Sequence, residues 1–175
     1  MAGFEDHHSR KALRLGSISA VIPVSLFVWF AVQLPVLAFG GRMQISVPWV
    51  PGLGVDVALS LDGLSGLYAL IITGIGALVM VYADAYLGEH PHIFRFFIYL
   101  HLFLLSMLGL VLSENLLLLF VFWELTTLFS FLLIGFEHES ASSRISARQA
   151  LMVTGGGGLL LLVCLLLMRQ AGGTY

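Results

Sequence analysis

The sequence predicts an all-α membrane protein with about five transmembrane helices and a short β-hairpin in the first non-cytoplasmic loop. Two observations indicate this fold class. The 175 residues are 59% hydrophobic and only 10% charged, whereas a soluble domain carries about 25% charged residues. The apolar residues also gather in runs of about 18 residues or more, which is the length that a helix needs to cross a bilayer. We therefore expect lipid to surround most of the chain.

A transmembrane module over residues 18–168 is expected between a polar N-terminal segment (1–17) and a short C-terminal tail (169–175). Its helices are predicted at residues 18–39, 64–87, 94–112, 116–136 and 147–168. The first apolar run is too long for a signal peptide. Pro23 and Pro35 should bend this helix without ending it. Five crossings would place the two termini on opposite sides of the membrane.

The segment between the first two helices alternates apolar and polar side chains over residues 55–62, after the turn sequence Pro-Gly-Leu-Gly at 51–54. This pattern predicts a β-hairpin over residues 44–61. Asp62 stands directly before the second helix. We expect it to cap this helix or to order the loop, rather than to take part in transport.

The third and fourth helices are joined only by Ser113, Glu114 and Asn115, which predicts an antiparallel helical hairpin. Ser113 or Asn115 can cap the fourth helix, and Glu114 lies favourably near its positive N-terminal end. The fifth helix contains four consecutive glycines at 155–158. They indicate tight helix packing or, alternatively, a broken helix that lines a polar cavity.

Basic side chains are distributed unevenly between the two ends of the predicted helices. The N-terminal end carries Arg10, Lys11, Arg14, Arg95, Arg144 and Arg148, and the opposite end carries Arg42 and Arg169. Basic residues accumulate on the cytoplasmic side of membrane proteins. We therefore expect the N-terminus and the loops at 88–91 and 137–146 to face the cytoplasm.

Several function classes find no support in the sequence. The net charge of −2 and the lack of a basic, aromatic-rich face argue against nucleic-acid binding. Cys164 has no partner for a disulfide within the chain. Histidines on the predicted cytoplasmic side are His7, His8, His90, His92 and His138. Their spacing does not match a closed metal site, and no motif for a cofactor or a catalytic nucleophile is present.

Glu124 is the most informative residue, because it lies in the apolar stretch 115–136, which is otherwise free of charge. About 8 residues into its helix, or roughly 12 Å, it is near the middle of the bilayer. A carboxylate there costs about 2.5–3.5 kcal/mol. We predict a proton-relay carboxylate; the alternative is a protonated group that hydrogen-bonds across a helix interface. Thr127 shares its helix face and is a candidate hydrogen-bond partner.

Two further polar residues are candidates for the same proton path. His101 lies about 7 residues into the third helix and could continue a relay, because imidazole exchanges protons near neutral pH; alternatively it is a packing residue. Asp84 lies near the cytoplasmic end of the second helix. It could receive protons from the cytoplasm, or it could be a solvated interfacial carboxylate.

Five sequence segments together resemble the antiporter-like membrane subunits. They are residues 60–65 (SLDGLS), 72–76 (ITGIG), 94–97 (FRFF), 114–120 (ENLLLLF) and 122–136 (FWELTTLFSFLLIGF). This family includes the large A subunit of Mrp-type cation/proton antiporters and the proton-pumping membrane subunits of respiratory complex I. The FWELT sequence and Ser143-Arg144 favour the Mrp A subunit. The resemblance runs from about residue 21 to 168 and corresponds to family helices two to six.

The resemblance implies that Glu124 is the membrane carboxylate of the proton path. In the family this carboxylate works with a lysine two helices later, whereas the only lysine here is Lys11. The resemblance therefore implies that other membrane subunits or segments complete the path, in a prokaryotic inner membrane and with protons and Na⁺ as the transported ions. Two alternatives stay open: a subunit of a complex I or hydrogenase-type redox-driven pump, and a non-catalytic assembly subunit.

Overall fold

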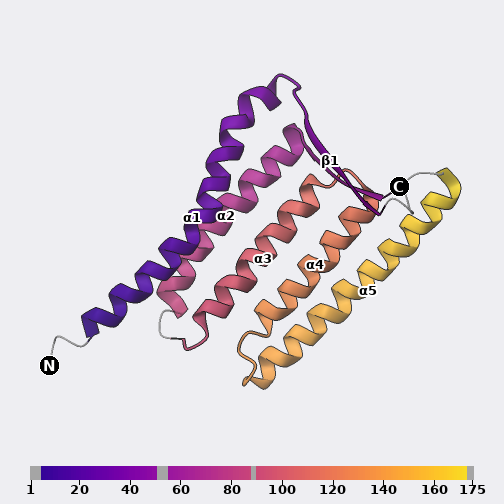
Figure 1. The fold of residues 1–175 in the computed structure, drawn as a ribbon. Helices are drawn as coiled ribbons and strands as arrows, with labels where there is room; N and C mark the ends of the chain where they lie inside the picture. Colours follow the sequence, from indigo (N-terminus) through magenta and orange to yellow (C-terminus); the bar gives the residue numbers. More distant parts are fainter. Residues whose placement is uncertain (1–4, 51–54, 88–89, 173–175) are drawn as a thin grey trace.

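The computed structural model describes residues 5–50, 55–87 and 90–172. These residues form α1 (Glu5–Ala38), β1 (Met43–Val50), β2 (Val55–Leu61), α2 (Gly63–Leu87), α3 (Ile93–Leu112), α4 (Leu116–Ile134) and α5 (Ala141–Gly172). The helices lie side by side in chain order (Figure 1), and each packs mainly on its neighbour in the sequence. All five contain a stretch long and apolar enough to cross a membrane. The predicted fold class is confirmed.

The connections alternate between the two ends of the row of helices. The N-terminal end of α1, the α2–α3 connection and the α4–α5 connection lie at one end, and the β-hairpin and the α3–α4 connection lie at the other (Figure 1). α1 continues through Pro23 and Pro35, as predicted, and changes direction along its length (Figure 1).

Two helices begin earlier than predicted. α1 begins at Glu5 and α5 at Ala141, whereas the apolar runs begin at residues 18 and 147. The hydroxyl oxygen of Ser140 accepts a hydrogen bond from the N–H of Ser143 at 3.4 Å, which caps the extended start of α5. Hydropathy detects only the part of a helix that lies in lipid, so polar first turns are missed. Arg144 therefore belongs to α5 and not to the predicted loop.

The predicted β-hairpin is confirmed, with β1 and β2 antiparallel and Met43 paired with Leu61. Its predicted turn at 51–54 lies outside the described residues. The hairpin also contacts the turn between α3 and α4, because the N–H of Glu114 donates to the Ala58 carbonyl at 3.0 Å. The sheet thus crosses the ends of several helices.

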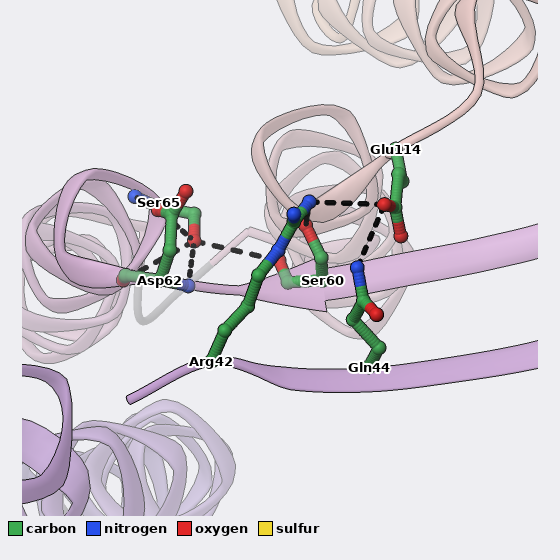
Figure 2. A network of polar contacts seen from close by, with 6 residues as sticks. All are labelled: Arg42, Gln44, Ser60, Asp62, Ser65 and Glu114. Atoms are coloured by element: carbon green, nitrogen blue, oxygen red, sulfur yellow. Dashed lines mark hydrogen bonds and ion pairs between the residues drawn. The ribbon is translucent and has the colours of Figure 1, made fainter. Parts of the chain in front are cut away.

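Glu114 links β1 to the α3–α4 turn (Figure 2). Its Oε1 accepts hydrogen bonds from Arg42 Nη2 at 2.9 Å and from Gln44 Nε2 at 2.7 Å. The sequence indicated only a local role for Glu114 near the start of α4. The structure adds a connection between segments that lie far apart in the chain.

Both predicted helix caps are present. Asn115 Oδ1 accepts from the N–H groups of Leu117 and Leu118 at the start of α4. Asp62 and Ser65 bond reciprocally at the start of α2 (Figure 2): the Ser65 N–H and hydroxyl donate to Asp62 Oδ1, each at 2.9 Å, and the Asp62 N–H donates to Ser65 Oγ at 2.8 Å. Because the Ser65 N–H and hydroxyl stabilise the ionised carboxylate, the pKa of Asp62 is lowered from its usual value of 3.8.

Adjacent helices approach closely where a glycine on one faces a large side chain on the next. A Cβ at Gly76 of α2 would overlap Leu104 of α3, and a Cβ at Gly109 of α3 would overlap the ring of Phe122 on α4. Small residues at such positions allow helices to pack tightly in membranes. The glycines therefore set the spacing of the row.

Candidate functional site

Glu124 points from α4 onto the backbone of α5. A Cβ at Gly158 would overlap Oε1 of Glu124 and would lie 3.0 Å from its Cδ. Oε1 is buried and has no hydrogen-bond partner among the described residues. In most folded proteins a buried polar atom is paired. Glu124 thus carries an unsatisfied carboxylate oxygen in an apolar span.

The glycine run that faces Glu124 does not break its helix. α5 is continuous from Ala141 to Gly172, so the alternative of an unwound segment is wrong. Within this glycine run, tight packing against the described residues is confined to Gly158, because a Cβ at Gly155, Gly156 or Gly157 would meet no atom of a neighbouring element within 4 Å. The single close contact of the run is therefore with the candidate proton carrier.

Thr127 lies one turn after Glu124 and is 7% exposed. It was expected to share the helix face of Glu124. The described contacts do not include the expected hydrogen bond, since Oε1 of Glu124 has no partner. The neighbouring Thr126 donates its hydroxyl to the Trp123 carbonyl of its own helix at 2.7 Å.

His101 connects α3 to α1. Its Nδ1 lies 2.8 Å from the Phe97 carbonyl oxygen, and its Nε2 lies 3.1 Å from the Ser19 carbonyl oxygen. His101 therefore joins the first turns of α3 to α1 through its two ring nitrogens.

Asp84 is only 4% exposed, so the alternative of a solvated interfacial carboxylate is wrong. It packs against α1, where a Cβ at Gly16 would overlap the Cβ of Asp84. Its Oδ1 is buried without a hydrogen-bond partner in the described part of the chain. Gly16, which precedes the predicted span in α1, lies against this carboxylate and leaves the room for it.

The structure divides the predicted site residues into two groups. Asp84 and His101 contact α1 within one helical turn, at Gly16 and Ser19. Glu124 instead contacts α5 at Gly158. Sequence reasoning missed Gly16 and did not separate Gly158 from the rest of its glycine run, because a glycine becomes informative only when the residue that it faces is known.

Two parts of this chain match known protein families. Residues 49–97 match the family described as NADH-ubiquinone oxidoreductase (complex I), chain 5 N-terminus, and residues 113–175 match NADH:quinone oxidoreductase/Mrp antiporter, TM. The chain is 41% identical over 145 residues to the A subunit of the Na(+)/H(+) antiporter of Alkalihalophilus pseudofirmus, and the match covers 82% of this chain and 18% of that protein.

Two further similarities extend this result. A probable A/B subunit of a K(+)/H(+) antiporter from Rhizobium meliloti is 46% identical over 143 residues, covering 80% of this chain and 14% of that protein. The structure of the Mrp complex from Dietzia sp. DQ12-45-1b matches with a TM-score of 0.70 and 33% identity, over 97% of this chain and 20% of that one. The chain thus spans about a fifth or less of the proteins it matches.

Proposed function

Since this chain belongs to the antiporter-like membrane subunits and corresponds to the N-terminal part of the Mrp antiporter A subunit, we propose that it works in a multisubunit cation/proton antiporter. The relatives are named for Na⁺/H⁺ and K⁺/H⁺ antiport. Protons and Na⁺ are the proposed transported ions, and other membrane subunits are the proposed partners.

Glu124 is the proposed proton-relay carboxylate. The observation that supports this role best is its buried Oε1, which has no hydrogen-bond partner in the described chain. A carboxylate that only joined two helices would be expected to have a donor across the interface. A relay group instead needs a free oxygen that can exchange a proton with a neighbouring group. Thr127, buried on the same face, is a proposed hydrogen-bond donor during that exchange.

Asp84 and His101 are proposed to receive protons at the N-terminal end of the row. Both contact the same turn of α1. Asp84 has an unpaired buried oxygen among the described residues, and both ring nitrogens of His101 lie within hydrogen-bonding distance of carbonyl oxygens. Two neighbouring groups that bind protons are suited to the start of a path from the cytoplasm.

The proposed orientation places the N-terminus in the cytoplasm. Arg95 lies in the first turn of α3, and Arg144 lies in the first turn of α5. Both helices begin at the same end of the row as α1 (Figure 1). The excess of basic residues at this end supports the cytoplasmic assignment.

The experiment that tests the role of Glu124 is cation-driven proton movement in everted membrane vesicles that contain the whole antiporter. Glu124→Gln keeps the shape of the side chain but cannot carry a proton, so transport should be lost while the subunits still co-purify. Glu137→Gln, at an exposed loop position, is the matched control and should transport normally. Undiminished transport by Glu124→Gln would rule out the relay.

A redox-driven pump is the second candidate, because both matching family descriptions name NADH:quinone or NADH-ubiquinone oxidoreductase. Mass spectrometry of the proteins that co-purify with the chain in mild detergent separates the two. Antiporter subunits without redox proteins would support the antiporter, whereas flavin or iron–sulfur subunits would support the pump. Intact transport in Glu124→Ala would instead indicate a non-catalytic assembly subunit.

A further inference from the structure

We propose that Gly158 is a positioning residue for Glu124. The space left by its missing side chain holds the Glu124 carboxylate at the α4–α5 interface, and we call this space the carboxylate seat. The proposal rests on the proposed role of Glu124 in proton transfer. It starts from one contact: a Cβ at Gly158 would overlap Oε1 of Glu124.

The same arrangement occurs elsewhere in the row with apolar partners. Leu104 occupies the space over Gly76, and Phe122 occupies the space over Gly109. At the α4–α5 interface the group over the glycine is a carboxylate oxygen that has no hydrogen-bond partner among the described residues. An apolar side chain would serve packing at lower cost. The contact between Gly158 and Glu124 therefore fixes the position of the carboxylate and does more than hold the two helices together.

The effect is specific to one position of the glycine run. At Gly155, Gly156 and Gly157 an added Cβ would meet no atom of a neighbouring element within 4 Å in the described part of the chain. An alanine there would change the helix in the same way as an alanine at 158, but without touching Glu124. The chain thus supplies its own matched controls.

A methyl group at 158 would have to move the carboxylate. The space on one side of the seat is already occupied, because Trp123 Cδ1 lies 3.5 Å from the same Cβ position. Either Glu124 rotates away from α5 or the two helices separate. Proton transfer needs the exchanging heavy atoms within about 2.6–3.2 Å of each other or of a bridging water. A shift comparable to a bond length should therefore slow transport at least tenfold.

A shorter acid provides a direct rescue. Aspartate at 124 withdraws the carboxylate by one carbon–carbon bond, about 1.5 Å, which makes room for a methyl group at 158. Glu124→Asp alone should reduce transport, because the acid no longer reaches its seat. In the double variant Gly158→Ala/Glu124→Asp the overlap is removed and an ionisable group is retained.

The test measures cation-driven proton movement by the assembled antiporter in everted vesicles. We expect Gly158→Ala to lose at least tenfold in rate, Gly157→Ala to stay within about twofold of the parent, and the double variant to exceed Gly158→Ala. Gly158→Ala/Glu124→Ala also removes the overlap but has no carboxylate, and should assemble without transporting. Transport in Gly158→Ala equal to that in Gly157→Ala, or no rescue by aspartate, would overturn the proposal.

Assembly and the relay itself are separated by two further measurements. If Gly158→Ala fails to co-purify with its partner subunits, aspartate at 124 should restore co-purification; failure to do so would place the clash elsewhere and overturn the proposal. If Glu124→Gln transports normally, the proposed relay itself is wrong. If Glu124→Gln is inactive while Gly158→Ala transports at the rate of Gly157→Ala, the relay role of Glu124 is retained and only the positioning role of Gly158 is refuted.

Discussion

Gly109→Ala tests how the row of helices is spaced. Gly109 is buried in α3, and its added Cβ would lie 2.5 Å from Cζ of Phe122 and still nearer to two other ring atoms. Carbon atoms in contact prefer about 3.5–4.0 Å, so the ring or α4 must move by about 1 Å or more. Because Phe122 is on the helix that carries Glu124, the same movement would disturb the proposed relay carboxylate.

The expected magnitude is a balance of two effects. Overpacking of a tight interface costs about 1–3 kcal/mol, and replacing glycine by alanine in a helix returns about 1 kcal/mol. The net loss for Gly109→Ala should therefore be about 0–2 kcal/mol in the free energy of unfolding. Gly157→Ala has the same gain in helix propensity, but its added methyl group overlaps no described neighbour. Gly109→Ala should therefore be about 1–3 kcal/mol less stable than this control.

The assay is denaturant unfolding of the chain in detergent, followed by the helical circular dichroism signal. Phe122→Leu should recover part of the loss in the Gly109→Ala background, because the overlapping ring atoms are gone, and the cavity left by the ring should keep the recovery incomplete. Equal stability of Gly109→Ala and Gly157→Ala would refute the account of helix spacing.

Three other predictions concern the ends of the helices. Glu114→Gln removes the ion pair with Arg42, in which the Arg42 side chain is 50% exposed and that of Glu114 is 35% exposed. The free energy of opening the hairpin should fall by about 0.2–1 kcal/mol, so amide exchange in β1 and β2 should quicken by up to about fivefold. Glu137→Gln should leave the exchange unchanged. The lowered pKa of Asp62 stabilises the fold above pH 3.8, and this contribution is lost as the pH falls through the lower folded-state value. Unfolding curves should show this acid-dependent loss in the parent and not in Asp62→Asn. In a Cys164→Ser background, Ser140→Cys should react with an impermeant maleimide from the cytoplasmic side and Asp56→Cys only from the other; the reverse pattern would invert the proposed orientation.

Local sequence signals predicted most of the secondary structure. Runs of apolar residues located the five spans, and the caps at Asp62 and Asn115 followed from side chains that bond to nearby backbone N–H groups. The pairing of Glu114 with Arg42 was missed, because it depends on how the hairpin folds back over the helices. No local pattern records such a long-range contact.

The site was predicted in part. Glu124 is visible in the sequence because a charge in an apolar span is rare. The burial of Asp84 was not predicted, because the first helix was expected to start at residue 18, which would leave this carboxylate open to water. The structure extends α1 to Glu5 and places Gly16 against Asp84. The seat at Gly158 likewise depends on the rotation of α5 relative to α4, which a run of identical glycines does not specify.

Proton exchange at Glu124 is the central claim, and the most direct test compares the transport rates of Glu124→Gln and Glu124→Asp in the assembled antiporter. The account predicts no cation-driven proton movement for glutamine and a reduced but measurable rate for aspartate, since aspartate carries a proton but sits about one bond short of the seat. Parental transport by Glu124→Gln would contradict the account.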